Sequence, residues 1–229
     1  MNRFDASILI WLNGMMGRWP DLERLLVFFL DSNLFKCAPV MALFYWAWFR
    51  REGQPRARET LLCALGGSMA SVVVARLLAA VTPMRLRPIH EAVLGLRLAT
   101  GLDPRALIHW SAFPSDHAAL FTALATGIFL VSRRAGLLAF AWTAVMVCFV
   151  RVLLGVHHPT DVLAGGVIGF AAAWVACRPA LRQRVSAPLL ELEGRRPALF
   201  YALFFVLTFE FCELFVNVRS LYAHLRVFV

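Results

Sequence analysis

Lysine is almost absent from this sequence of 229 residues. Lys36 is the only one, so nearly all of the formal net charge of +9 is carried by arginine. Charged residues make up only 16% of the chain, and they stand in short clusters between apolar stretches. A nucleic-acid-binding domain instead gathers its basic residues on one face or along one helix. The clustering therefore predicts that nucleic acid is not a partner.

Cysteine pairs at short spacing are also missing. The five cysteines are single, widely separated and placed in or beside apolar segments, and none forms a CxxC pair: Cys37, Cys63, Cys148, Cys177 and Cys212. This pattern favours small apolar packing residues over a redox or zinc site. No cleavable signal peptide is expected, because polar residues interrupt the apolar part of the first 21 residues.

Apolar residues are abundant, at 60% of the chain, whereas a soluble domain has about 45–50%. Several apolar runs approach the roughly 20 residues that a helix needs to cross a bilayer. The sequence therefore predicts an all-α polytopic transmembrane bundle in a single domain, residues 1–229. About six spans are expected, at 34–49, 59–83, 118–132, 136–156, 162–177 and 198–218. Residues 1–33 are predicted to form an interfacial or partial helix, with an irregular seventh span as the alternative.

Arginine placement predicts the orientation. The segments 50–58, 132–136 and 178–196 contain four, two and five arginines, and they are read as cytoplasmic loops. The 84–117 loop and the short turn at 157–161 then face outward. All the concentrated polar chemistry falls on that outward face, in "RLRPIHE" (85–91), "FPSDH" (113–117) and "VRVLLGVHHPTD" (150–161).

The "FPSDH" segment is read as an anion site at a helix start. Ser115 is expected to cap the helix that begins near Ala118. Free N–H groups and a capping hydroxyl at such a start bind phosphate well. Arg85, Arg87 and Arg151 lie at the same membrane edge, and the planar guanidinium suits phosphate oxygens. For Arg85 or Arg87 alone, snorkelling among lipid headgroups would be the simpler explanation.

Arg151 needs a stronger explanation, because it stands inside an apolar run where an unpaired charge costs several kcal/mol. His157 and Asp161 follow it. If the chain is helical there, they share a face and can hydrogen-bond. A carboxylate on one imidazole nitrogen fixes the tautomer and leaves the other nitrogen free as a nucleophile.

Two other chemistries fit less well. A Ser-His-Asp hydrolase draws its triad from distant parts of the chain, and the sequence has no GxSxG elbow. No familiar zinc spacing is present either, so no metal is expected.

Arg87-Pro88, then Pro114-Ser115-Asp116-His117, then Arg151-x5-His157-x3-Asp161 resembles the three-part signature of the type 2 phosphatidic acid phosphatases. These are integral-membrane lipid phosphatases that share a helical core with vanadium-dependent haloperoxidases. The resemblance covers residues 59–177, the expected catalytic core, and leaves 198–218 as an additional C-terminal span. Pro-Ser-Asp-His is similar to the second motif of bacterial undecaprenyl pyrophosphate phosphatases.

The resemblance implies roles for the matching positions. His157 would be the nucleophile, oriented by Asp161, with His158 as its competitor, and His117 would be the general acid. Phosphate would be held by Arg87, Arg151 and Ser115, with Arg85 and Asp116 beside them. Neither a metal nor another cofactor is implied.

Three departures stand out. Ala80 occupies the position of the family's first-motif lysine, and Arg76 or Arg85 could replace that charge. Val150 stands where a serine is common. Asp116 replaces a glycine, and it could contact a basic partner or adjust the protonation of the leaving group.

The resemblance implies a bacterial inner-membrane enzyme of cell-wall lipid recycling, whose active site faces the periplasm and whose partners are membrane lipids and a lipid phosphate. Undecaprenyl pyrophosphate is the first expectation. Phosphatidylglycerol phosphate, phosphatidic acid, lipid A and a non-catalytic binder or transporter stay open. No obligate protein partner is expected.

Overall fold

The structure, a computed structural model, describes residues 2–50 and 53–213, and within these ranges it is all helical, with no strand. The elements follow in the order α1 (Arg3–Asn13), α2 (Pro20–Asp31), α3 (Asn33–Phe49), α4 (Gln54–Val81), the short 3-10 turns η1 (Pro88–His90) and η2 (Ala92–Leu94), α5 (Asp116–Val131), α6 (Arg133–Trp142), the π-helix η3 (Thr143–Phe149), α7 (Val150–Leu153), α8 (Pro159–Ala176), α9 (Pro179–Arg195) and α10 (Pro197–Cys212).

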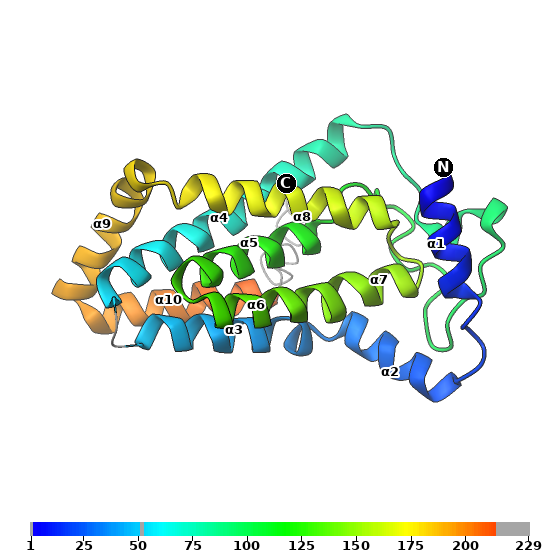
Figure 1. Cartoon of the computed structure of the whole chain (residues 1–229), viewed down its shortest axis with the longest axis horizontal. Helices are drawn as coiled ribbons and strands as arrows, with labels where there is room; N and C mark the ends of the chain where they lie inside the picture. The colour runs from blue at the N-terminus through cyan, green and yellow to red at the C-terminus, as the bar shows by residue number, and fades with distance from the viewer. Residues whose placement is uncertain (1, 51–52, 214–229) are drawn as a thin grey trace, which may run out of the picture.

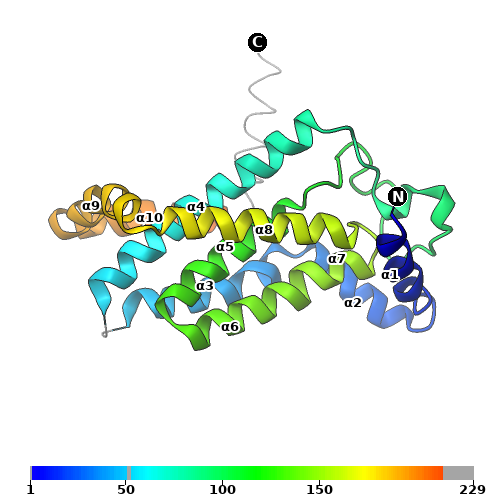
Figure 2. The same ribbon diagram turned by 45° about the horizontal axis from the view of Figure 1, so that its top comes forward.

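The helices form an elongated bundle with α9 at one end and α1 lying across the other (Figure 1). The C-terminal part of α4 extends away from the bundle, and the 82–115 connection leads from it to the end where α1 lies (Figure 2). The α7–α8 turn lies at this same end. The three segments that sequence analysis singled out are therefore gathered at one end of the molecule.

Three helices among the described residues are individually long and apolar enough to cross a membrane: Gln54–Val81, the continuous run Arg133–Leu153, and Pro159–Ala176. A fourth candidate is the pair α2 and α3, which is bent by 62° at its break. The apolar helices α5 and α10 are shorter. The chain is thus a membrane protein with three to four candidate spans by length and composition. The six predicted apolar segments all contain helices, but six complete crossings remain a prediction, and 214–218 lies outside the described residues.

Two parts of the prediction need adjustment. Residues 178–196 were read as a loop, but they form the 17-residue helix α9. Its charge and its internal Pro188 hide the helical signal, while Pro179 suits a first helical turn and Arg182 pairs with Glu59 of α4 at 3.1 Å. Residues 2–32 contain the two helices α1 and α2, and α2 leads into α3 across the break.

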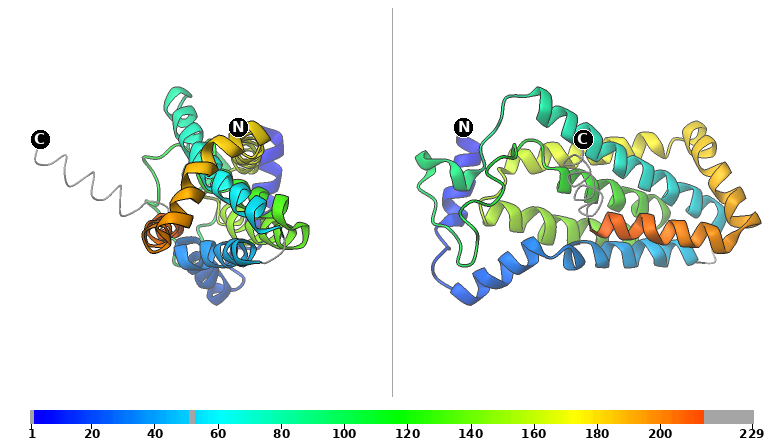
Figure 3. Two further views of the ribbon diagram at one scale, coloured as in Figure 1. Left: turned by 90° about the vertical axis from the view of Figure 1, so that its left-hand side faces the viewer. Right: turned by 180° about the vertical axis from the view of Figure 1, so that it is seen from behind.

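Aromatic packing joins the last described helix to the core. Trp48 of α3 packs against Phe200 and Phe204 of α10, with ring centroids 6.0 and 4.7 Å apart. From behind, α10 runs beside α3 along the bundle (Figure 3). Rings of this size bury much apolar area, so α10 is a packed part of the bundle.

Candidate active site

A cavity of about 980 Å³ opens at the end of the bundle that carries the three sequence segments. Its polar lining combines cations, two carboxylates and two imidazoles: Lys36, Arg76, Arg87, Arg151, Asp31, Asp116, His117 and His157. Apolar side chains, including Leu30, Leu107 and Trp110, form the rest of the wall. A concave site with a few convergent polar groups on an apolar wall is typical of a ligand site.

Close packing of α5 on α8 sets the position of the "PSDH" segment. Ser115 caps α5 by accepting the N–H of Ala118 at 3.4 Å, as predicted, and its own N–H donates to the carbonyl of Asp161 at 3.0 Å. Gly165 and Gly169 of α8 face the backbone of α5 so closely that a Cβ atom would lie 2.2 Å and 2.1 Å from carbonyl oxygens there. Small residues four apart allow such an approach. Ser115 was expected to help hold phosphate, but it is fully buried and is not among the cavity-lining residues. The contact that the structure shows is the cap of the helix that carries His117.

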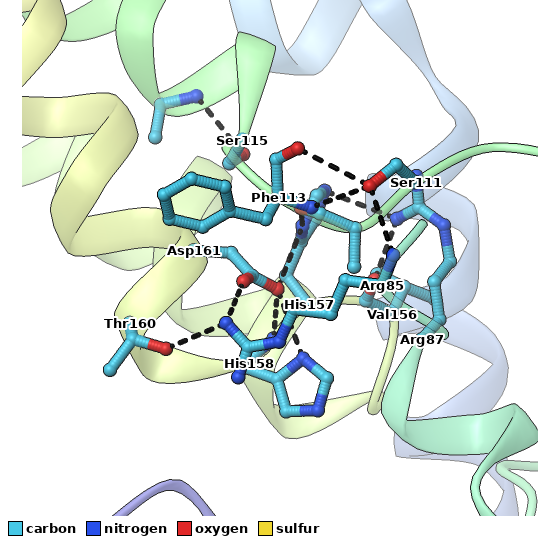
Figure 4. Close-up of polar contacts among 12 residues, drawn as sticks. Arg85, Arg87, Ser111, Phe113, Ser115, Val156, His157, His158, Thr160 and Asp161 are labelled. Atoms are coloured by element: carbon cyan, nitrogen blue, oxygen red, sulfur yellow. Dashed lines mark hydrogen bonds and ion pairs between the residues drawn. The ribbon is translucent and has the colours of Figure 1, made fainter. Parts of the chain in front are cut away.

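His157 lies in the cavity wall with both ring nitrogens engaged (Figure 4). Its Nδ1 is 2.9 Å from the carbonyl oxygen of Ala112, and because a carbonyl only accepts, Nδ1 carries the hydrogen. Nε2 then holds the lone pair, and it lies 3.2 Å from Nη1 of Arg87. The tautomer needed for attack through Nε2 is therefore fixed by the backbone.

Asp161 was expected to orient His157 from a shared helical face. The helix begins only at Pro159, and the Asp161 carboxylate lies 3.7 Å from Nδ1 of His157, beyond hydrogen-bond distance. The carbonyl of Ala112 makes the closer contact. Asp161 is thus a second acceptor near Nδ1, and its negative charge stabilises a positively charged imidazole there.

His158, the competing nucleophile, is placed elsewhere. It is fully buried and does not line the cavity. Its Nδ1 lies 3.1 Å from Asp161, and its Nε2 lies 3.2 Å from Glu91. Its backbone N–H also donates to Asp161 at 2.8 Å, which caps α8. With a carboxylate at each ring nitrogen, His158 is a structural link and His157 is the histidine that can reach a ligand.

Arg87 and Arg151 are the two buried arginines of the cavity. Arg87 donates to the carbonyl of Val156 at 2.6 Å, while its Nε is buried without a hydrogen-bond partner among the described residues. Arg151 donates to the carbonyl of Val147 at 2.9 Å, within the π-helix that precedes it. Irregular turns of this kind are frequent at functional sites. Two buried guanidinium groups beside a cavity suit an anionic ligand.

Asp116 has two partners, and both are basic. One carboxylate oxygen accepts from Nδ1 of His117 at 2.7 Å, and the other pairs with Arg76 of α4. Arg76 also stacks over Trp110, 4.7 Å from the ring centroid. Asp116 was grouped with the phosphate-binding residues, but its oxygens face cations of the protein. It therefore orients His117 and leaves Nε2 of that ring for a ligand.

Arg85 was also expected at the phosphate, but its guanidinium lies against Asp161 and Thr160 (Figure 4). Its guanidinium bonds to Asp161 at 2.5 Å and to Asp5 at 2.7 Å, and it does not line the cavity. Asp5 is completely buried and also accepts from Thr160. Sequence analysis missed Asp5, although an acidic residue in the apolar stretch "FDASILIW" is the signal that marks it. Through Asp5, helix α1 holds the Arg85–Asp161 pair in place.

Burial lowers the pKa of two cavity groups that lie in the connections between helices, Arg87 and His157. The pKa of the Arg87 guanidinium falls to about 10, chiefly because it is removed from water, while the charges of Asp116 and Asp161 oppose that effect. Burial likewise lowers the pKa of His157, and its contact with Asp161 acts in the opposite direction. Near neutral pH, Arg87 is therefore charged and His157 is neutral. These are the states in which an arginine can bind an anion and an imidazole can act as a nucleophile.

A metal-binding cluster is not found in the part of the chain that the structure describes, where no three His, Cys, Asp or Glu side chains are placed to share an ion. The positive charge of this site comes from side chains instead.

Comparison with known proteins finds partial similarity to a permease protein and to a phosphatase. Over 67 residues it is 40% identical to the bacitracin transport permease protein BcrC of Bacillus licheniformis, a match that covers 28% of this chain and 30% of that protein. Over 115 residues it is 33% identical to decaprenylphosphoryl-5-phosphoribose phosphatase of Mycobacterium tuberculosis, covering 50% of this chain and 58% of that protein. The matches thus span no more than about three fifths of these relatives. No solved structure matches significantly.

The three polar segments lie within the part of the chain that the family comparison covers, and so does the cavity lining except Leu30, Asp31 and Lys36. That comparison matches residues 61–184, more than half of the sequence, to the PAP2 superfamily. The chain therefore belongs to the PAP2 superfamily.

Proposed function

We propose that this protein hydrolyses the terminal phosphate of a membrane lipid through a phosphohistidine on His157, and that its substrate is a polyprenyl diphosphate such as undecaprenyl pyrophosphate. One observation carries the proposal: His157, His117 and the two buried arginines Arg87 and Arg151 line a single cavity. Family membership and the similarity to a decaprenylphosphoryl-5-phosphoribose phosphatase support the lipid phosphate.

In the first step, Nε2 of His157 attacks the terminal phosphorus, and the bond from phosphorus to the leaving oxygen breaks. His117, protonated on both ring nitrogens, gives its Nε2 proton to that oxygen and becomes neutral. Arg87 and Arg151 stabilise the negative charge on the three remaining oxygens. Nδ1–H of His157 stays bonded to Ala112 while the ring becomes positive, and the nearby Asp161 carboxylate favours that charge.

In the second step, water attacks the phosphorus of the phosphohistidine. His117, now neutral at Nε2, takes the proton from the water. The N–P bond breaks, inorganic phosphate leaves, and Nε2 of His157 regains its lone pair. Asp116 holds Nδ1 of His117 throughout at 2.7 Å, so the ring presents the same nitrogen in both steps. No step needs a metal, because the arginines supply the positive charge.

The surroundings of the cavity suit a substrate whose tail stays in the bilayer. The lining includes Leu30, Leu107 and Trp110, and Leu107 and Trp110 are also exposed at the surface. We place this end of the bundle on the outer, periplasmic side of a bacterial inner membrane, with six helices crossing it. The arginine-rich segments at the opposite end support that orientation. Dephosphorylation there would recycle a cell-wall lipid carrier.

The direct test is phosphate release by the detergent-purified full chain in EDTA. Undecaprenyl pyrophosphate, phosphatidylglycerol phosphate and phosphatidic acid are offered in parallel to the wild type and to His157→Ala. We expect metal-independent release, fastest with the diphosphate, and a loss of at least about 10³-fold in the variant, because its nucleophile is missing.

His109→Ala is the matched control, because His109 is exposed on the 82–115 connection and should keep wild-type activity. Wild-type enzyme quenched with alkali should carry phosphate on His157, and acid should release it. Turnover of none of the lipids, or full activity in His157→Ala, would contradict the mechanism and would favour a non-catalytic lipid-phosphate binder.

A further inference from the structure

Lys36, the only lysine of the chain, is held at the break between α2 and α3. Its Nζ donates to the carbonyl of Leu30 at 2.8 Å and lies 3.5 Å from the carbonyl of Asp31. Its own carbonyl accepts the indole N–H of Trp142 at 3.3 Å. The residue is only 4% exposed. The bend in the helix pair therefore fixes the position of this ammonium group.

The ammonium group is buried without a carboxylate partner. Among the described residues, no acidic side chain lies within ion-pair distance of Nζ, whereas Arg76, which lines the same cavity, is paired with Asp116. The two carbonyls at the end of α2 stabilise a cation, yet they leave one of its three N–H donors unused. A buried charge inside a membrane helix is costly unless it is paired or functional. The unused donor and the unpaired charge both indicate that an anionic ligand binds at Lys36.

The cavity provides space for such an anion beside Lys36. Lys36 lines it together with Leu30 and Asp31 from the α2–α3 wall, while Arg87 lines it beside His157. Arg87, in contact with the nucleophile, serves the phosphorus that is attacked. Lys36 lies on α3, whereas Arg87 and His157 lie in the 82–115 connection and in the α7–α8 turn. Its charge is therefore available to a second group of the same ligand. A volume of about 980 Å³ is at the upper end for small-molecule sites and leaves room for that group.

We propose that Lys36 forms a second phosphate subsite, which binds the inner phosphoryl group of a lipid diphosphate while the terminal one reacts at His157. The inference rests on the proposed function. When the bridging P–O bond breaks, the electron pair stays on the leaving lipid monophosphate, and Lys36 stabilises the charge that develops there. Lys36 thus makes the site selective for diphosphates over monophosphates.

The kinetic test compares a polyprenyl diphosphate with the monophosphate of the same chain length. In Lys36→Met, which keeps the length and the apolar stem, the ratio of kcat/KM for diphosphate over monophosphate should fall at least tenfold. Lys36→Arg should keep most of that ratio. Arg24→Met removes one positive charge from an exposed position on α2 that does not line this cavity, and it should leave the ratio at its wild-type value. An unchanged ratio in Lys36→Met would overturn the subsite.

A binding test separates this proposal from the proposed function, because it needs no turnover. Inorganic pyrophosphate and orthophosphate are added to the full chain, and the thermal unfolding midpoint is measured. Pyrophosphate should stabilise the wild type more than orthophosphate does, and Lys36→Met should lose that difference while still responding to orthophosphate. If pyrophosphate binds in this way but no lipid is hydrolysed, the subsite stands and the catalytic proposal fails. If both anions stabilise the wild type equally, the subsite is wrong whatever the activity.

Discussion

Replacing Gly165 with alanine would test how closely α8 must approach α5 for the site to form. The added Cβ would lie 2.2 Å from the carbonyl oxygen of Ser115, whereas carbon–oxygen contacts settle near roughly 3.3–3.6 Å. The two helices must therefore separate by roughly 1 Å at the residue that starts the helix of His117. Gly166, the next residue, is the matched control, because its Cβ would meet only the hydroxyl of Thr122 at 3.7 Å.

The magnitude follows from this displacement. A misplacement of about 1 Å at a catalytic group can cost about 10²-fold in rate, so we expect kcat of Gly165→Ala to fall about 100-fold. Overpacking costs roughly 1–3 kcal/mol, and the better helix propensity of alanine returns about 1 kcal/mol. The thermal midpoint of Gly165→Ala should therefore lie below that of Gly166→Ala.

Phosphate release and the thermal midpoint in detergent are measured for both variants and the wild type. Gly166→Ala should match the wild type in rate. Equal rates and equal midpoints for the two variants would refute the reasoning, because the contact at Ser115 would then not position His117. A lower midpoint in Gly165→Ala with unchanged kcat would show that the helix contact matters for stability alone.

Other consequences of the site can be measured with the same assay. Because burial lowers the pKa of His157, the nucleophile stays neutral below its ordinary value of about 6.5. In the pH profile of kcat/KM, the midpoint of the acid limb that comes from the enzyme should therefore lie below that pH. An acid limb with its midpoint above pH 7, not explained by titration of the substrate, would contradict this expectation. His158→Gln should lower the unfolding midpoint but keep phosphohistidine formation. His157→Gln should keep the unfolding midpoint but lose phosphohistidine formation, and labelling with a radioactive terminal phosphate distinguishes the two variants. Asp5→Asn removes one of the two carboxylates on Arg85, and we expect kcat about 10-fold lower with a smaller change in KM; an equal effect from Asp21→Asn, on an exposed carboxylate, would show that the charge alone matters. Prolonged dialysis against EDTA should leave activity unchanged, and recovery on adding Zn²⁺ or Mg²⁺ would overturn the metal-independent mechanism.

Sequence reasoning worked where the signal is local. Apolar runs located the helices, since crossing a bilayer demands them, and Ser115 marked the start of α5 because its hydroxyl caps the helix. It was least successful for α9, whose helical pattern is obscured by charge and by Pro188, and which owes its place to contacts such as that between Arg182 and Glu59.

Within the candidate site, the sequence by itself indicated which residues are candidates for the chemistry, because an arginine in an apolar run and adjacent histidines need a reason to be there. Only the tertiary structure decided what each of them touches. In the folded protein, the ring of His157 contacts a backbone carbonyl, and Arg85 pairs with Asp5 and Asp161. Lys36, from the α2–α3 pair, lines the cavity. Local sequence dictates helices and caps through interactions a few residues apart. The contacts of His157 and Arg85 instead join residues 45 to 80 positions apart, and only the packing of the helices brings such residues together.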